Sequence, residues 1–429
     1  MKFFWSIVCF VGLPLMADAQ LGGFGKKLKD KASQKINQRV DARVDKQLDK
    51  TLDNIEGKNR DTVSRPASPV ADNVKQEAAT STGAFSSYDF IPGEKILYAE
   101  DFSQEAAGEL PLHWNTNGSG EVVIPAGENS HWLRLHNPFM YLSAGKAVLP
   151  ENFTAEFDLL LQLKNNGWMY PSLSVGLLST SQEPAGSNSW LKTIDTYEAV
   201  KATLYPEENN NSRVLLESFA ETKEYFKSDA RQYAALQQFY GRPVHVAIQV
   251  QKARFRMWIN AEKIFDIPRA LACQYALNQL FFKVGQTNYA ENQYGIYITN
   301  IRLATGVPDT RHKLLKEGRF ITTGILFAAG SAVIRPESTP VLKEIAGILQ
   351  ENENLRFRIT GHTSSEGDNQ YNLGLSARRA AAVKTALVSD WGIAADRLDT
   401  AGMGEKEPIA DNKSKEGKSA NRRVEFVKL

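Results

Sequence analysis

The sequence contains little cysteine. Its 429 residues include two, Cys9 and Cys273, and Cys9 lies within an apolar run at the N-terminus. Loss of that run as an export signal would leave one cysteine, so no disulfide could form within the mature chain. The residues before Cys273 are apolar, Ala270-Leu-Ala272. We therefore expect Cys273 to be a buried small hydrophobic side chain rather than a reactive thiol.

A long apolar run and an excess of one charge are also missing. After residue 20 no segment approaches the roughly 18 apolar residues that a membrane-spanning helix requires. The net charge is +2, with 51 Lys and Arg against 49 Asp and Glu, which argues against a protein that binds nucleic acid by neutralising phosphates. His131 and His136 have too few potential ligands around them for a metal site. We expect no nucleic-acid partner, no metal and no other cofactor.

The first residues have the pattern of an export signal. Lys2 precedes an apolar run over residues 3–16, and Ala17-Asp-Ala19 has the small residues of a cleavage site. We expect residues 1–19 to be a signal peptide and Gln20 to begin the mature chain. Cys9 lies too early in the run to become a lipid-modified N-terminal cysteine. The pattern therefore predicts an exported protein without a lipid anchor.

Two segments without a core of their own follow. Within residues 20–57 an apolar residue recurs at every fourth position from Leu28 to Leu52, which predicts a charged amphipathic helix whose narrow apolar stripe winds around its surface. Three interpretations stay open: self-association or partner docking, contact with a membrane surface, and a solvated helix without a partner. Residues 58–87 are rich in Ser, Thr, Ala, Pro and charge, which predicts a disordered linker.

Residues 88–306 contain many short runs that resemble β-strands and are separated by turns. This density indicates an all-β sandwich or barrel. The region's tryptophans are expected mainly in its core, with a sugar-stacking platform as the alternative. The predicted strands cover residues 96–102, 121–125, 132–136, 153–163, 173–178, 200–205, 214–219, 244–251, 255–259, 280–285 and 294–303.

Three short motifs of this region resemble the concanavalin A-type lectin and glucanase jelly roll. They are Glu100-Asp-Phe-Ser103, Gly108-Glu-Leu-Pro-Leu-His-Trp114 and Tyr297-Ile-Thr-Asn-Ile-Arg-Leu303. The resemblance implies a jelly-roll sandwich whose partner is a glycan or an envelope protein.

Glucanases of this fold place Glu-x-Asp-x-(x)-Glu on one strand, because alternate residues share a face and two carboxylates must flank one glycosidic bond. Glu156-Phe-Asp158 supplies the first two residues, but Leu160 and Leu161 occupy both positions for the acid. We therefore expect no catalytic residues here. Glu156 and Asp158 are expected to be a pair on the sheet surface.

A polar connector is expected at residues 307–317, and strand-like and helix-like segments alternate from residue 318 onward. The strands are expected at 320–327, 355–360, 397–402 and 422–429, and the helices at 336–351 and 371–388. This order predicts an α+β domain over residues 318–429, with its helices on one face of a small sheet.

The loop before the second of these helices predicts a small binding site. A strand-to-helix loop presents free backbone N–H groups to an anion, and Arg379, two turns further on, presents a guanidinium fork to a carboxylate. His362 is the one imidazole close to the loop in the sequence, and no nucleophile–base pair is evident. The pattern favours binding over catalysis.

This domain resembles the OmpA C-terminal-like peptidoglycan-binding family. The resemblance implies binding of the meso-diaminopimelate of cell-wall stem peptides, with an aspartate after Gly-His-Thr for the ammonium and an arginine of the next helix for the carboxylate. Arg379 matches the arginine, but Ser364 stands at the aspartate position. The matching blocks are Ile325–Ala332 with Pro336–Ser338, Gly361–Thr363, Asn372 with Leu375–Ala380, Gly402–Gly404 with Pro408–Asn412, and Asn421–Val424.

The substitution at Ser364 matters because a serine hydroxyl supplies no charge to an ammonium. Glu366 or Asp368, in the same loop, could supply that carboxylate from a shifted position. The expected peptidoglycan-binding residues are therefore Arg379, Ser364, Thr363, Glu366, Asp368 and Asn372.

The sequence thus predicts a multidomain, non-enzymatic cell-envelope protein, either periplasmic or associated with the outer membrane. It would anchor to peptidoglycan through residues 318–429 and present a β-sandwich binding module. Two alternatives stay open: residues 88–306 form an outer-membrane β-barrel, or they form a glycan hydrolase on the jelly roll.

Overall fold

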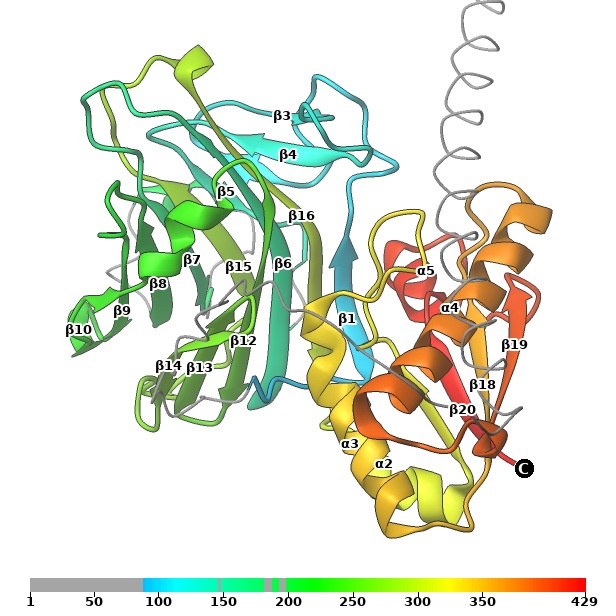
Figure 1. The fold of residues 1–429 in the computed structure, drawn as a ribbon. Helices are drawn as coiled ribbons and strands as arrows, with labels where there is room; N and C mark the ends of the chain where they lie inside the picture. The colour runs from blue at the N-terminus through cyan, green and yellow to red at the C-terminus, as the bar shows by residue number, and fades with distance from the viewer. Residues whose placement is uncertain (1–87, 146–147, 181–186, 193–197) are drawn as a thin grey trace, which may run out of the picture. The chain divides into compact units, whose positions relative to one another are not determined.

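The computed structural model describes residues 88–145, 148–180, 187–192 and 198–429 (Figure 1). The expected signal peptide, N-terminal helix and linker, residues 1–87, lie outside the described residues. The chain divides into two units, Met1–Thr82 and Gly83–Leu429, and all described residues belong to the second. In this described part no helix has the length and apolar character needed to cross a membrane.

Residues 88–306, called here the two-sheet region, contain two antiparallel sheets of eight strands each. The first sheet has the order β14-β13-β12-β6-β16-β4-β3, and β1 also pairs with β16. Its strands are β1 (Lys95–Glu100), β3 (Gly120–Val123), β4 (Trp132–Leu135), β6 (Asn152–Leu163), β12 (Pro243–Gln251), β13 (Arg254–Ile259), β14 (Glu262–Ile267) and β16 (Tyr294–Thr305).

The second sheet has the order β10-β9-β8-β7-β15-β5-β2, and β11 also pairs with β9. Each predicted strand overlaps an observed one, whereas β2, β5, β10, β11 and β14 were not predicted. The strands of this sheet are β2 (Asn115–Thr116), β5 (Met140–Leu142), β7 (Leu173–Leu178), β8 (Ala199–Tyr205), β9 (Arg213–Ala220), β10 (Lys223–Lys227), β11 (Arg231–Gln232) and β15 (Gln279–Val284). The 3-10 helices of the region are η2 (Asn188–Leu191), η3 (Ala234–Phe239) and η4 (Glu291–Gln293).

The two sheets share one hydrophobic core. Side chains of a strand alternate between its two faces, and Phe157 and Leu159 of β6 enter the same buried cluster as Val175 of β7 and Phe282 of β15. The rings of Phe157 and Phe282 meet edge to face at 5.2 Å between centroids. The arrangement is a β-sandwich. Its assignment to the jelly-roll type stays a prediction.

Trp114, Trp132, Trp190 and Trp258 are buried, whereas the side chain of Trp168 is 58% exposed. The prediction for Cys273 is wrong, because this residue is exposed. It lies in the connection between β14 and β15 with a positive φ of 59°, after the buried residues Ala270 and Leu271.

The C-terminal domain, residues 318–429, contains a four-stranded sheet of order β17-β20-β18-β19. Strands β18 and β19 are parallel and the other pairs are antiparallel. Helices α3 and α4 contribute to the same core as the sheet (Figure 1). The elements are β17 (Arg319–Thr322), η6 (Pro336–Ser338), α3 (Thr339–Glu351), β18 (Phe357–His362), α4 (Asn369–Trp391), η7 (Ala395–Arg397), β19 (Leu398–Gly404), α5 (Lys415–Asn421) and β20 (Val424–Lys428).

Two glycines allow α4 to lie close to the sheet. A Cβ on Gly361 of β18 would lie 2.2 Å from the carbonyl oxygen of Ser376, and one on Gly402 of β19 would lie 2.4 Å from the nitrogen of Ala377. A larger residue at either position would push the helix away. This close packing fixes the turn of α4 that carries Arg379.

The expected polar connector is instead partly helical and partly buried. Residues 307–317 contain α2 (Thr310–His312) and the π-helix η5 (Lys313–Glu317). Leu314 of this segment is fully buried in the core of the C-terminal domain. Ile91, at the start of the two-sheet region, packs against the same core. Burial of these apolar side chains ties the two parts of the chain together.

Candidate functional site

The loop that precedes α4 is held by its own side chains. Asp368 is the N-cap of the helix, and its carboxylate accepts a hydrogen bond from the backbone N–H of Tyr371 at 2.8 Å. The side-chain amide of Asn372, which is buried, donates to the carbonyl oxygen of Glu366 at 2.9 Å and to the carboxylate of Glu405 at 2.9 Å. These residues give the loop its shape, because they satisfy backbone groups that would otherwise lack a partner.

Neither carboxylate that could replace the missing family aspartate is free. Asp368 caps the helix, and Glu366 lies 2.8 Å from the ammonium of Lys418 and 3.3 Å from the guanidinium of Arg422. The hydroxyl of Ser364 is buried and donates to Glu366 at 3.4 Å. The polar groups of this loop are therefore engaged mainly with one another.

The hydroxyl of Thr363 is also buried, and it has no hydrogen-bond partner among the described residues. Beside it, the His362 ring is buried, and its Nε2 lies 3.3 Å from the Glu425 carboxylate. Burial lowers the pKa of His362, and the charge of Arg423 adds to that effect. Both features place the start of the loop inside the domain.

Arg379, one of the six predicted site residues, lines a cavity and has few polar contacts. Its Nε donates to the carbonyl oxygen of Ser331 at 2.9 Å, and its guanidinium lies over the ring of Phe327, 4.9 Å from the centroid. No carboxylate among the described residues pairs with it. Burial lowers the pKa of Arg379 to about 10. A partly buried guanidinium without a counter-charge is suited to a carboxylate ligand, which can accept two parallel hydrogen bonds.

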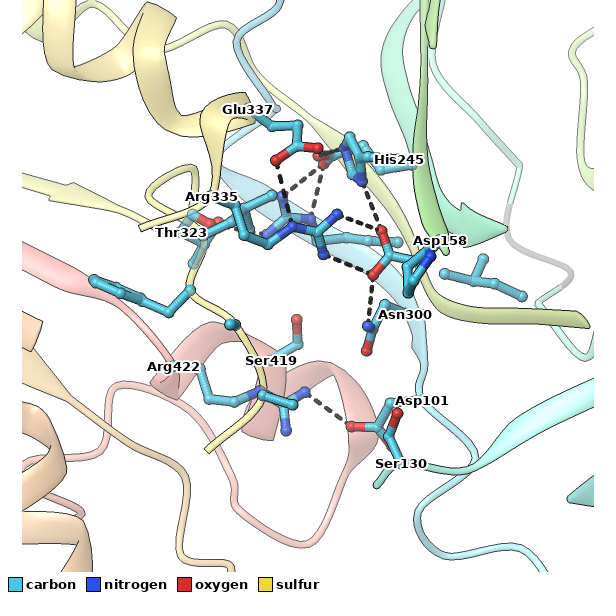
Figure 2. Close-up of a pocket in the computed structure, with 18 of the residues that line it drawn as sticks. Asp101, Ser130, Asp158, His245, Asn300, Thr323, Arg335, Glu337, Ser419 and Arg422 are labelled. Carbon is cyan, nitrogen blue, oxygen red and sulfur yellow. Dashed lines mark hydrogen bonds and ion pairs between the residues drawn. The ribbon is translucent and has the colours of Figure 1, made fainter. Parts of the chain in front are cut away.

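Arg379 lines a cavity of about 860 Å³ between the C-terminal domain and the two-sheet region. Figure 2 shows other residues that line it, among them Asp158 and Asn300 from the two-sheet region and Thr323 and Arg335 from the C-terminal domain. Residues 325–330 provide apolar lining on the side of the C-terminal domain, and Trp132, Phe239 and Pro243 do so on the other side. Of the six predicted site residues, Arg379 lines this cavity, whereas Thr363, Ser364, Glu366, Asp368 and Asn372 do not. The cavity is thus lined by Arg379 but not by the loop residues with which it was grouped.

A buried cluster of charges joins the two parts of the chain beside this cavity, as Figure 2 shows. Arg335, which precedes η6, forms a two-point ion pair with Asp158 of β6, at 2.8 Å and 2.9 Å. Arg302 of β16 lies 2.7 Å from Glu156 and also donates to the carbonyl oxygen of Thr323. The prediction of a surface pair is wrong, because Glu156 and Asp158 are each 3% exposed and covered by basic side chains.

His245 of β12 lies between the same two carboxylates. Its Nδ1 is 3.0 Å from Asp158, and its Nε2 is 3.4 Å from Glu156. Burial by itself would lower the pKa of His245, but the hydrogen bond with Asp158 and the charges of both carboxylates outweigh it and raise this pKa to about 9. Burial opposes ionisation of Asp158 as well, yet Arg335 and His245 hold its pKa below the usual range. The cluster is therefore charged at neutral pH.

A second group of ion pairs lies on the other side of the cavity. Lys415 of α5 is 2.7 Å from Glu100 of β1, and Arg422 is 3.0 Å from Asp101. In the ion pairs that cross between the two parts, Asp158–Arg335, Glu100–Lys415 and Asp101–Arg422, the two-sheet region contributes the acid and the C-terminal domain the base. The contact between the two parts is thus electrostatically complementary.

The sequence contained partial signals for the residues that the prediction missed. Arg335 directly precedes the family block Pro336–Ser338, and Arg422 lies within the block Asn421–Val424, although neither received a role. Glu156 and Asp158 alternate with core residues and are followed by Leu160, an apolar residue on their own face of the strand. That leucine indicated that this face is covered.

Residues 326–422 match the OmpA family. Through this domain, the chain belongs to the OmpA family. The matched residues all lie within the C-terminal domain.

The curated relatives match over the same domain. The chain is 37% identical over 107 residues to "Putative lipoprotein YfiB" of Escherichia coli, which covers 25% of this chain and 67% of that protein. It is 41% identical over 100 residues to "Outer membrane protein Omp38" of Acinetobacter baumannii, covering 23% of this chain and 28% of that one. The match to this chain covers only 28% to 31% of the length of Omp38 and of two similar outer-membrane porins.

Among solved structures, the cell wall anchor of the T6SS from Pseudomonas aeruginosa is 36% identical, over 24% of this chain and 74% of that one. The TM-score is 0.22. The similarity again concerns one domain of the chain.

Proposed function

We propose that this protein is a non-enzymatic cell-envelope protein that binds the stem peptide of peptidoglycan through its OmpA-family domain. The observation that carries the proposal is Arg379, a guanidinium at a cavity with no carboxylate partner among the described residues. Membership of the OmpA family supports it. The names of relatives, an outer-membrane protein and a lipoprotein, support a periplasmic or outer-membrane-associated location.

The expected contact is a two-point hydrogen bond from the guanidinium of Arg379 to a carboxylate of the ligand. Its Nε is already held by Ser331, and its side chain lies over Phe327, so the group is oriented before the ligand arrives. Binding then loses little side-chain freedom. The ligand's charge also compensates a cation that burial has destabilised.

For the two-sheet region we propose the concanavalin A-type jelly roll, because two antiparallel sheets share one core and three short motifs resemble that group. A glycan or an envelope protein is then its partner. The exposed indole of Trp168 supports a glycan, since such a ring can stack on a sugar. Binding to a glycan array by the full chain, compared with Trp168→Ala, tests this assignment; equal signals from the two proteins would argue against it.

The test of the main proposal is sedimentation of the purified full chain with sacculi. Arg379→Ala removes a charged contact, which is typically worth about 1.5–3 kcal/mol, so binding should weaken about tenfold or more. Arg378→Ala, one position earlier on α4, is the matched control for loss of a positive charge. Equal binding by the two variants, both shown to be folded by circular dichroism, would overturn the proposal.

A further inference from the structure

The carboxylates that line the cavity differ in whether a base neutralises them. Glu100 pairs with Lys415, Asp101 with Arg422, Glu156 with Arg302, and Asp158 and Glu337 with Arg335. Glu128 lines the same cavity, and within the described residues it has no side-chain hydrogen bond and no ion pair. By elimination, Glu128 is the carboxylate of the described lining that is free to accept a ligand's cation.

The position of Glu128 explains why it lies beside the cavity. It follows β3 in the loop Pro125–Ser130, whose turn is closed by a hydrogen bond from the backbone N–H of Glu128 to the carbonyl oxygen of Pro125 at 3.0 Å. Ser130 and Trp132, next in the chain, line the cavity as well. The side chain of Glu128 is half-buried. Burial, with the charge of Asp158, raises its pKa, so a cation placed beside it would relieve an unfavourable charge.

Two uncompensated groups of opposite charge therefore border one cavity, Arg379 from the C-terminal domain and Glu128 from the two-sheet region. A cavity of about 860 Å³ is within the size range of ligand pockets, and its lining combines apolar and neutral polar residues with the charged groups. Such an arrangement suits a ligand that carries a carboxylate and an ammonium group. Among the described lining residues, the uncompensated carboxylate Glu128 comes from one part of the chain and the unpaired guanidinium of Arg379 from the other.

We propose that the two-sheet region completes the binding site, with Glu128 accepting the ammonium group of an amino-acid or peptide ligand whose carboxylate is bound by Arg379. This inference rests on the proposed function and goes beyond it, because the acid comes from outside the OmpA-family domain. It accounts for Ser364, since an acid in the loop is not needed when the opposite wall supplies one. The loop acids are engaged elsewhere, Glu366 with two bases and Asp368 with the helix N-terminus.

The experiment measures binding of two stem tripeptides to the full chain by calorimetry. Both contain meso-diaminopimelate, and in one of them its free amino group is acetylated. Glu128→Gln, a substitution of nearly equal size, should weaken binding of the first peptide about 10- to 100-fold and leave binding of the acetylated peptide unchanged. Glu109→Gln is the control, at an exposed carboxylate of the same region that does not line the cavity.

The outcomes separate this inference from the proposed function. If the wild type binds, Arg379→Ala weakens binding and Glu128→Gln behaves as Glu109→Gln, the proposed function stands and the role of Glu128 is wrong. If Glu128→Gln weakens both peptides equally, Glu128 does not contact the ammonium and the inference is again wrong. If the wild type binds neither peptide, both proposals fail. Selective loss for the unmodified peptide supports the composite site.

Discussion

Asp158 and Arg335, 177 residues apart in the sequence, form a two-point ion pair with distances of 2.8 Å and 2.9 Å. Asp158 is almost fully buried, whereas the side chain of Arg335 is 22% exposed. Asp158 belongs to the two-sheet region, and Arg335 belongs to the C-terminal domain. This pair therefore connects the residues that match the OmpA family with a region outside that match.

Removal of one partner of this pair should destabilise the protein. Arg335→Gln leaves the Asp158 carboxylate buried with less compensation, and loss of one member of a buried pair costs about 3 kcal/mol or more. Urea denaturation of the full chain measures the change in the free energy of unfolding. Arg311→Gln, in the exposed pair with Glu351, is the control and should have little effect. Equal denaturation midpoints for both variants would contradict the structural role of the pair.

The stability of the protein should fall between about pH 6.5 and pH 9. The pKa of His245 is raised to about 9 in the folded chain, from about 6.5 in an unfolded chain. Its contribution is therefore fully present below pH 6.5 and is lost as pH rises through 9, a change on the order of 3 kcal/mol. The neighbouring charges are Glu156, Asp158, Arg302 and Arg335.

Thermal denaturation at a series of pH values measures this dependence. His245→Gln should flatten the profile in that interval, whereas His312→Gln, at an exposed histidine, should leave it unchanged. A wild-type profile as flat as that of His245→Gln would mean that the imidazole does not carry the charge described here.

Ser364→Asp should leave binding of the diaminopimelate peptide unchanged, because Ser364 is buried and does not line the cavity that Arg379 and Glu128 border. The new carboxylate would lie beside Glu366, which Lys418 and Arg422 already neutralise. Calorimetry with Ser364→Ala as the control measures the effect. A gain of about tenfold, the difference that a charge-assisted hydrogen bond typically makes, would place the ammonium at the loop and argue against Glu128.

Asp368→Ala should cost about 1 kcal/mol of stability, because it removes the N-cap of α4. Asp368→Ser retains a capping oxygen and should recover most of that loss. If Asp368 acts as a cap and not as a ligand contact, the serine variant should also bind the peptide as well as the wild type does. Denaturation midpoints and calorimetry on the two variants test both statements. Loss of binding with retained stability would instead place Asp368 in the ligand site.

Local sequence patterns determined the elements of the fold. Short strand-like runs between turns located β6, β7 and β12, and the change to helical spacing located α4, which is capped by Asp368 and Gly392. These signals are local, since the period of side chains along a strand or helix depends on neighbours a few residues away. The five family blocks likewise located the domain that matches the OmpA family.

Tertiary structure alone decided which charges are compensated. Asp158 meets Arg335 although 177 positions of sequence separate them, and Asp101 meets Arg422 across 321 positions. Such partners follow from the order of strands in a sheet and from the docking of two parts of the chain, which no local period encodes. For the same reason the sequence could group Arg379 with Glu366 but could not reveal that Glu366 is neutralised and that Arg379 shares its cavity with Glu128.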